Sequence, residues 1–367
     1  MSDHIPFEIQ SEIMKRFPVK SLVQFRSVSK QWKSFIDCPE FIKNYHINHP
    51  NPKHHLLVRF NLGSVQTYTS IIDDNTFPQQ KFPLFAPEPL NLLRNTTILG
   101  SVDGLVCFYG EYKDKELKNH LVVLWNPSVR KCVGIPIPNV FDYRNTRIGF
   151  GVCRDTNDPK LVKINVVETP HISWDVQVFT LSSHVWKTVY TGAPFASCNL
   201  MWAHVFIDGI VYWGSRGPRG SFIISFDLKS DKFVEVCVPE RFVRNYSFWL
   251  AKVNESLGLL EFYIEGGVSV CGVWTRKDGV NNSFTKTYTV KVEGKSVFYR
   301  VLGFRNNGEV LLQLDDDDDS EGSQIEVYEP SSGRINSFGI SGEYLTFSAW
   351  SYMETLLLLD QSNTIIH

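Results

Sequence analysis

The sequence lacks several features that mark common classes of protein. Its longest purely aliphatic run, Leu356–Leu359, is far shorter than the roughly 20 residues that a membrane-spanning helix needs. The first residues, MSDHIPFEIQ, contain no basic segment followed by an apolar one, so we expect no signal peptide. The net charge of -2 provides no basic field for nucleic acid. We therefore expect an intracellular protein of the cytoplasm or nucleus, with neither a membrane nor a nucleic acid as partner.

Cysteine pairs and the common catalytic motifs are missing as well. The seven cysteines are odd in number and form no CxxC pair, so we interpret them as small core residues of a reduced protein. The sequence contains no HExxH, GxSxG or GxxxxGK[S/T] motif. The acidic run Asp315–Asp319 lacks the spacing of a calcium loop, and we interpret it as a solvated loop. We expect no catalytic residue, no cofactor and no metal site.

Apolar and aromatic residues are plentiful, and their spacing changes near residue 50. The chain is 43% hydrophobic and holds 26 Phe, 14 Tyr and 9 Trp, enough for a large core. Apolar residues recur with a helical period before residue 50, and with the period of two that is typical of strands after residue 54. The segment His49–Lys53 contains two prolines, which suit a boundary. We predict a small all-α domain at residues 1–48, a linker at 49–54 and a mainly β domain at 55–367.

The first predicted helix carries more apolar surface than one face can bury. It begins at Ile5, includes Ile9 and Ile13, and ends at Phe17 because Pro18 follows. Its apolar side chains span an arc of about 200°, twice what a one-sided surface helix needs. Either this helix buries one surface in its own domain and one against a partner, or it is sandwiched within the protein. A domain of about 45 residues has a marginal core, which favours the partner.

Three further short helices are predicted in the same domain. The second runs from about Lys20 to Val28, and Ser29 is a suitable N-cap for the third. Val28 and Trp32 belong to a narrow apolar stripe at helical spacing. Pro39 can open the fourth helix, because proline is favoured at the first helical position.

The β domain contains a repeat. An aromatic residue ends a strand at intervals of 54, 47, 48 and 54 residues, and a polar turn and a new strand follow. A repeat of about 50 residues with several strands predicts β-propeller blades, about six of them, whereas a β-sandwich, the alternative, needs no repeat. We expect residues 55–72 and a closing strand at Tyr352–Asp360 to build the sixth blade. The repeated aromatics, expected at equivalent inter-blade positions, are Trp125, Phe179, Phe226, Trp274 and Tyr328.

The motifs of residues 5–46 occur in a recognisable order. Ile5-Pro6, Phe17-Pro18, Val19-Lys20-Ser21-Leu22 and Pro39-Glu40-Phe41 together resemble the F-box. Ile5 and Phe17 stand where leucine is usual, which changes side-chain shape but not polarity. Further along the chain, Asp103-Gly104-Leu105-Val106 and Leu124-Trp125-Asn126-Pro127-Ser128 are similar to stretches of the plant F-box-associated, kelch-like propeller.

The resemblance implies a non-catalytic substrate receptor of an SCF-type ubiquitin ligase. In that family the F-box binds a Skp-type adaptor, which connects to a cullin and a RING protein, and the propeller holds a protein substrate. The alternatives are a pollen S-locus F-box protein that recognises ribonucleases, a non-degradative F-box scaffold, and a propeller enzyme or glycan-binding module. Carried over by motif, the adaptor-contacting residues are Ile5, Pro6, Ile9, Ile13, Phe17, Pro18, Leu22, Val28 and Trp32, and we expect the first seven to form a partly exposed patch.

Three long loops are candidates for the substrate surface. They span residues 168–175 with His171 and Trp174, residues 193–202, and residues 214–221 with Arg216 and Arg219. We expect these loops on a common face, because propeller ligands usually meet loops that converge at one face. The arginine loop is either a plain surface turn or a contact for an acidic patch on the substrate.

Overall fold

The structure is a computed structural model, and its contacts divide the chain into two compact units. The terminal unit comprises Met1–Leu57, Thr69–Pro138 and Ser351–His367, and the central unit comprises Val58–Tyr68 and Asn139–Trp350. No helix in the described ranges is long and apolar enough to cross a membrane. The structure describes residues 5–366 except 49–51, 115–119, 141–144, 168–172, 193–194, 196–197, 246–247, 277–282, 293–298 and 316–321.

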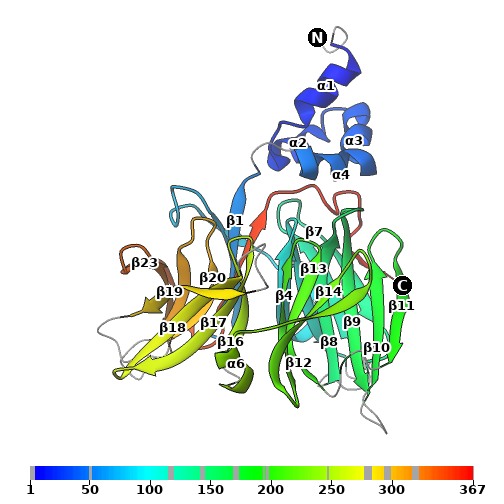
Figure 1. The fold of residues 1–367 in the computed structure, drawn as a ribbon. Helices are drawn as coiled ribbons and strands as arrows, with labels where there is room; N and C mark the ends of the chain where they lie inside the picture. The colour runs from blue at the N-terminus through cyan, green and yellow to red at the C-terminus, as the bar shows by residue number, and fades with distance from the viewer. Residues whose placement is uncertain are drawn as a thin grey trace. The chain divides into compact units, whose positions relative to one another are not determined.

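Four short helices form the helical head, residues 5–48 (Figure 1). Pro6 and Pro18 each precede a helix, and their carbonyl oxygens accept its first hydrogen bonds. Ser29 Oγ accepts a hydrogen bond from Trp32 N over 3.1 Å, which confirms Ser29 as the N-cap of the third helix. The helices are α1 (Phe7–Met14), α2 (Val19–Phe25), α3 (Lys30–Ile36) and α4 (Pro39–Asn48).

Six sheets follow the head, and the predicted mainly β fold with six blades is confirmed. The first sheet has the order β24-β1-β2-β3, so strands from both ends of the β domain share one blade, as expected. Its strands are β24 (Ser348–Met353), β1 (His54–Leu62), β2 (Val65–Ile72) and β3 (Lys81–Leu84). The second has the order β25-β7-β6-β5-β4 and contains β4 (Leu93–Val102), β5 (Leu105–Tyr112), β6 (His120–Asn126), β7 (Lys131–Ile137) and β25 (Thr364–Ile365), with α5 (Glu88–Asn91) before it.

The other four sheets each pair consecutive strands in sequence order. The third holds β8 (Thr146–Cys153), β9 (Asp158–Val167), β10 (Ser173–Thr180) and β11 (Val185–Gly192). The fourth holds β12 (Asn199–Ile207), β13 (Ile210–Gly217), β14 (Gly220–Asp227) and β15 (Lys232–Val236), and α6 (Glu240–Asn245) follows it. The fifth holds β16 (Phe248–Val253), β17 (Ser256–Glu265), β18 (Val268–Arg276) and β19 (Phe284–Lys291). The sixth holds β20 (Tyr299–Phe304), β21 (Val310–Asp315), β22 (Gly322–Glu329) and β23 (Arg334–Glu343).

The repeated aromatics occupy equivalent places in five sheets, as predicted. Each lies near the end of the third strand of its sheet: β6, β10, β14, β18 and β22. Four of them are buried, and Trp274 is half-buried. Trp274 pairs with Lys286 of β19, next to a shift in the register of the two strands. The repeat therefore predicts the positions of the blades correctly, although the strand pairing opposite the aromatic differs in one of them.

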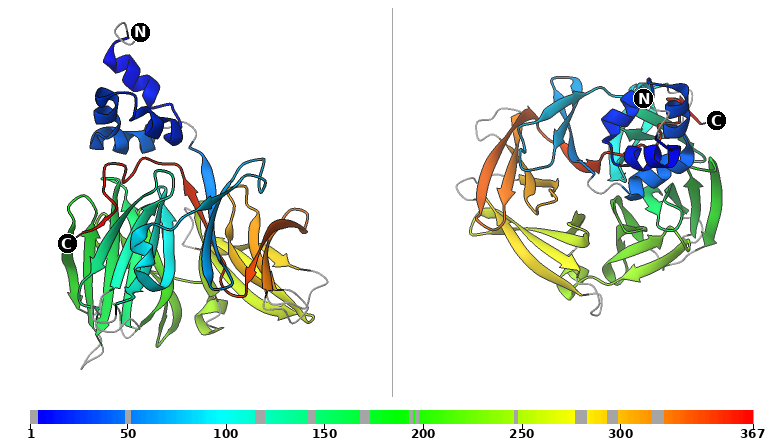
Figure 2. Two further views of the ribbon diagram at one scale, coloured as in Figure 1. Left: turned by 180° about the vertical axis from the view of Figure 1, so that it is seen from behind. Right: turned by 90° about the horizontal axis from the view of Figure 1, so that it is seen from above.

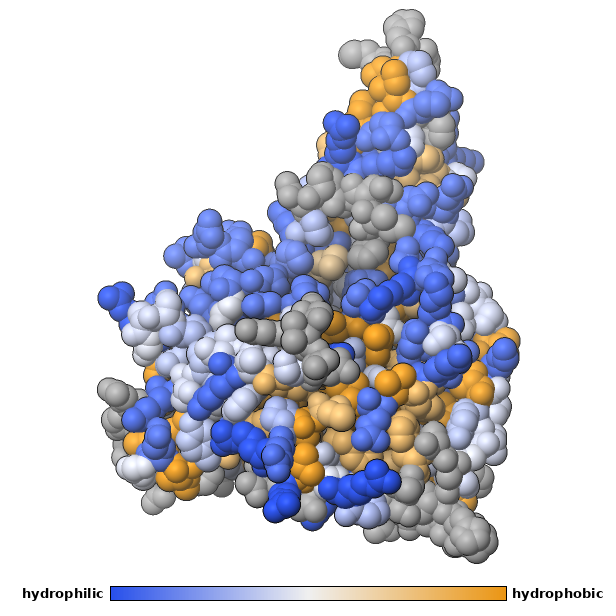
Figure 3. Space-filling model, viewed as in Figure 1, coloured by the Kyte–Doolittle hydropathy of each residue, from blue (hydrophilic) through white to orange (hydrophobic). Residues whose placement is uncertain are grey.

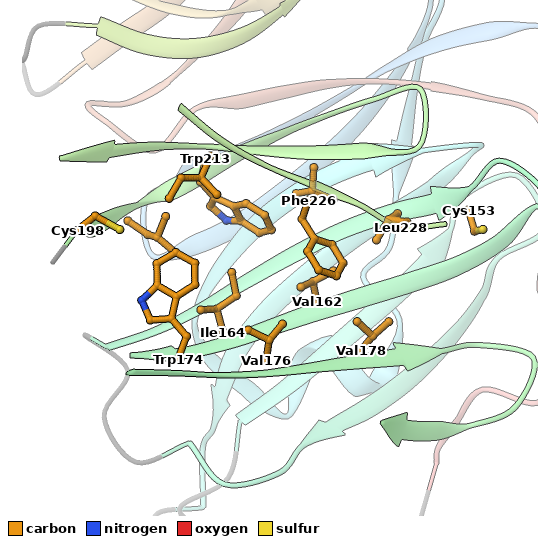
Figure 4. Packing of buried hydrophobic residues seen from close by; sticks show 13 residues of the cluster. Cys153, Val162, Ile164, Trp174, Val176, Val178, Cys198, Trp213, Phe226 and Leu228 are labelled. Atoms are coloured by element: carbon orange, nitrogen blue, oxygen red, sulfur yellow. The ribbon is translucent and has the colours of Figure 1, made fainter. Parts of the chain in front are cut away.

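The core between the third and fourth sheets shows how this repeat works (Figure 4). Phe226 of β14 lies against Val162 and Val178 of the neighbouring sheet, within a cluster that also contains Trp174 and Trp213. Alternate residues of β10 share this face because side chains on a strand alternate between its two sides. The aromatic side chains bury the sheet faces against each other, which stabilises the stack of blades.

The leucine run near the C-terminus belongs to a different structure from the one predicted. The closing strand is β24, Ser348–Met353, so the prediction of a strand at Tyr352–Asp360 is wrong. Leu356 and Leu359 are instead buried in one cluster with Met14 and Leu22 of the helical head. Figures 1 and 2 both show this red segment beside the helices. The head therefore shares its core with the chain end.

Hydrogen bonds fix the backbone of this segment. Asn126 is fully buried, and its Nδ2 donates to the carbonyl oxygens of Thr355 and Leu357 over 3.0 and 2.7 Å. Asn126 Oδ1 accepts from Ser128 N over 2.9 Å. A Cβ atom at Gly104 would lie 2.1 Å from Thr355 Cγ2, so the residue at position 104 has to be glycine. Both family-typical stretches, 103–106 and 124–128, thus hold the segment that supports the head.

Candidate functional site

The first helix presents an apolar stripe to solvent. Ile5, just before α1, and Ile9 and Ile13 within it recur every four residues and are 45%, 51% and 46% exposed. Met14, on another side of the helix, is buried in the core of the head. Figure 3 shows hydrophobic residues gathered over the α1 end of the head. The described chain leaves this stripe uncovered, as expected for a partner-binding surface and contrary to the sandwiched-helix alternative.

The rest of the head holds α1 in a fixed place. Tyr45 of α4 donates a hydrogen bond through its hydroxyl to the carbonyl oxygen of Phe17, over 2.8 Å. Burial raises the pKa of Tyr45, and the Glu354 carboxylate raises that pKa further, so the phenol stays protonated as a donor. Arg26 Nε lies 2.6 Å from Asp37 Oδ1 and joins the ends of α2 and α3. The stripe is therefore presented on a rigid support.

The other residues assigned to the adaptor contact divide into three groups. Pro6, Pro18 and Val28 are exposed, and Phe17 and Trp32 are half-buried. Leu22 is 0% exposed, so the expectation that it belongs to the exposed patch is wrong. Leu22 lies in the seven-residue helix α2, where it faces the cluster of Leu356 and Leu359. Motif position alone does not separate such core leucines from contact residues.

The substrate-loop residues also meet different outcomes. His171 lies outside the described residues. Trp174 is 1% exposed and packs against Phe195 and Phe233, so the prediction that it is a surface residue is wrong. The alternation of Trp174, Val176 and Val178 places all three on the buried face, and this pattern was visible in the sequence. Arg216 and Arg219 are exposed, as predicted.

The strand ends that flank the three loops lie at one edge of the third and fourth sheets. Trp174 pairs with Gly192, and Asn199 pairs with Arg216, so the start of one strand meets the end of the next in each sheet. The two sheets are joined at this edge because Arg147 Nε, at the start of β8, donates to the carbonyl oxygen of Leu200 over 2.7 Å. The expected common face is therefore present for the described parts of these loops.

Two exposed tryptophans, one at the end of the candidate loop 193–202 and one on the fifth sheet, were not named as site residues. Trp202 of β12 lies over the buried Arg147 guanidinium, which is 5.0 Å from the ring centroid. Trp249, at the start of β16, is 62% exposed. Exposed tryptophans are frequent anchors of protein interfaces. In the sequence, the signal for both residues was a tryptophan near the start of a strand. The short helix α6, just before β16, was not predicted either.

Most of the cysteines lie in the core. Cys107, Cys132, Cys153, Cys198 and Cys271 are buried, in agreement with their interpretation as core residues, whereas Cys38 is half-buried and Cys237 is exposed. Within the described ranges, no three His, Cys, Asp or Glu side chains are grouped as metal ligands. The acidic run falls mostly on residues 316–321, outside the described residues.

Comparison with known proteins gives two family matches. Residues 2–44 match the F-box domain, and residues 55–354 match a family described as the F-box associated beta propeller domain. A putative F-box protein of Arabidopsis thaliana is 32% identical over 247 residues, which cover 64% of this chain and 59% of that protein. Another F-box protein of the same plant is 28% identical over 241 residues, which cover 63% and 60%. The chain spans about six tenths of the length of these curated relatives.

Proposed function

Because the chain belongs to the family of F-box proteins with an F-box associated beta propeller domain, we propose that it is a substrate receptor of an SCF-type ubiquitin ligase. The helical head binds a Skp-type adaptor and, through it, a cullin and a RING protein. The β domain holds a protein substrate, and the complex works in the cytoplasm or nucleus. The receptor contributes proximity rather than chemistry, because tethering raises the local concentration of substrate lysines.

The observation that carries this proposal is the exposed stripe of α1. Ile5 before the helix and Ile9 and Ile13 within it form an exposed apolar surface in the segment that matches the F-box, and Met14 anchors the helix in the core of the head. Burying an aliphatic side chain contributes about 1.5–3 kcal/mol, so three such residues supply several kcal/mol towards adaptor binding. The predicted boundary at residues 49–54 stays a prediction.

The fate of the bound proteins tests the receptor function. Tagged wild-type chain and the variant Ile9→Asp/Ile13→Asp are expressed in plant cells, with and without a proteasome inhibitor. We expect a bound protein that is short-lived with the wild type and accumulates on the variant or with the inhibitor. A bound protein whose half-life is unchanged in every arm would instead support the non-degradative scaffold.

A further inference from the structure

Two arginine-bearing elements meet at the loop edge of the central unit. Arg216 lies near the end of β13, Arg219 lies in the turn between β13 and β14, and α6 carries Arg244. Gly220, which ends the turn, has a φ of +116°, and a Cβ atom there would lie 2.3 Å from the carbonyl oxygen of Val243 in α6. This close approach places the turn directly against the helix, so arginines that are 25 residues apart in sequence, such as Arg219 and Arg244, share one surface.

The helix α6 is held in one orientation. Phe242 is 1% exposed and packs against Phe248 and Trp274, with ring centroids 5.7 and 5.4 Å apart. Arg241 forms an ion pair with the buried Glu261 and lies over the Trp274 ring at 5.2 Å. Phe242 and Arg241 therefore anchor the helix, and Arg244 remains exposed. Figure 3 shows strongly hydrophilic residues beside hydrophobic ones in the region of α6.

The charges of this surface are mainly positive. The end of β13, the turn and α6 together carry Arg216, Arg219, Arg241 and Arg244. The carboxylates of these described elements and of their ion pair are Glu240 and Glu261. Glu261 forms its ion pair with Arg241, and the other charged side chains of these elements, all exposed, are Arg216, Arg219, Arg244 and Glu240. The exposed Trp249 follows α6 on β16, a strand that lies beside β13 and β12.

We propose that this surface binds an acidic segment of the protein substrate that also carries a large apolar side chain. Arginine guanidinium groups bind carboxylates through paired hydrogen bonds, and an exposed tryptophan offers a flat anchor for an apolar residue. A nucleic acid is a poorer match, because the chain is acidic overall and three arginines neutralise few phosphates. The inference names the substrate class of the proposed receptor and rests on that function.

Peptide selection on the full-length chain tests this surface. A phage-displayed library of random peptides is selected on immobilised wild type, on Arg219→Glu/Arg244→Glu, and on Lys232→Glu/Arg334→Glu. The last variant makes the same charge change at exposed residues of other strand ends. We expect wild type and control to enrich peptides with Asp, Glu and a large apolar residue. The first variant should lose this enrichment and bind the selected peptides about tenfold more weakly.

Four results would overturn the proposal. They are no acidic enrichment on wild type, equal enrichment on the Arg219→Glu/Arg244→Glu variant, equal loss on the control, and displacement of the peptides by a lower concentration of polyuridine RNA. Co-purification of the adaptor is measured for the same three proteins. If the adaptor co-purifies but the peptide binding is unselective, only the acidic-segment inference is contradicted. If the adaptor is absent from all three proteins, the receptor function itself is contradicted.

Discussion

The helical head and the sheets of the central unit differ in the exposure of their regularly spaced apolar residues. In the head, Ile9 and Ile13 of α1 and Ile5 just before it are half exposed and recur every four residues. In the sheets, Phe179 and Phe226 are buried at equivalent positions of successive blades, and exposed apolar residues such as Ile264 occur on separate strands. A regular apolar pattern thus serves a core in one region and a partner surface in the other. Exposure, not the pattern, distinguishes the two uses.

The sheet side of this comparison predicts the largest loss of stability. Phe226→Ala should lower the free energy of unfolding by about 3–5 kcal/mol. The substitution leaves a cavity between two sheets that the surrounding side chains cannot fill completely. The measurement is denaturant unfolding monitored by tryptophan fluorescence. Val234→Ala, at an exposed residue of the neighbouring β15, is the matched control and should change stability by less than about 0.5 kcal/mol. Equal effects of the two would contradict the assigned core.

The leucine segment is the place where the head depends on the chain end. Leu359→Ala should destabilise the head by about 3 kcal/mol, because Leu359 is buried among the residues of α1, α2 and α4. Limited proteolysis of residues 5–48 measures this effect directly. Leu345→Ala, at an exposed leucine, provides the control. A head that resists protease equally well in both variants would show that it folds without the segment.

A buried histidine in the sheets predicts a dependence of stability on pH. His204 Nε2 accepts a hydrogen bond from Phe150 N over 3.1 Å, and burial lowers its pKa from 6.5 to about 4. Below pH 6.5 the imidazole of His204 therefore binds a proton in the unfolded chain, whereas in the folded chain it stays neutral down to about pH 4. Stability from this residue is complete above pH 6.5 and is lost progressively between pH 6.5 and 4, by about 3 kcal/mol in total.

The comparison with a non-titrating variant isolates this effect. Glutamine at position 204 offers a carbonyl oxygen to Phe150 N and has no proton to gain. The unfolding free energy of His204→Gln should fall less steeply between pH 6.5 and 4 than that of the wild type. Parallel pH profiles of the two proteins would show that His204 does not carry the dependence.

The smallest predicted effect lies in the head. Ser29→Ala removes the side-chain cap on Trp32 N and should cost about 1 kcal/mol, whereas Ser29→Asp should retain the cap. Thermal unfolding of the three proteins measures the difference. If alanine and aspartate gave the same midpoint, the cap would contribute nothing to the stability of α3.

Local signals in the sequence predicted much of this architecture. Proline and serine marked the helix starts, because φ restriction and capping act within a few residues. The aromatic repeat predicted the blades, because each repeated aromatic lies at the same place in a separate sheet of consecutive strands. The leucine run was misassigned because a short apolar run has no period that separates a strand from a buried loop.

The candidate sites were harder to predict because they depend on contacts distant in sequence. Leu22 is a core residue in a cluster that joins the helices of the head to Leu356 and Leu359, more than 300 residues away. The surface formed by Arg219 and Arg244 depends on Gly220 meeting α6, which no local pattern of the sequence reveals. Trp174 was the exception, since its alternation with Val176 already indicated the buried face.

We expect the exposed isoleucines of α1 to bind the adaptor, whereas exposed apolar residues of the sheets do not. The affinity of the full chain for a Skp-type adaptor is measured by titration calorimetry for wild type, Ile9→Asp/Ile13→Asp and Val234→Asp/Ile264→Asp, with circular dichroism to confirm folding. The head variant should bind more than about 100-fold more weakly, because each aspartate would be buried without a partner at the interface. The sheet variant should bind as the wild type does. A folded head variant with unchanged affinity would contradict the claim.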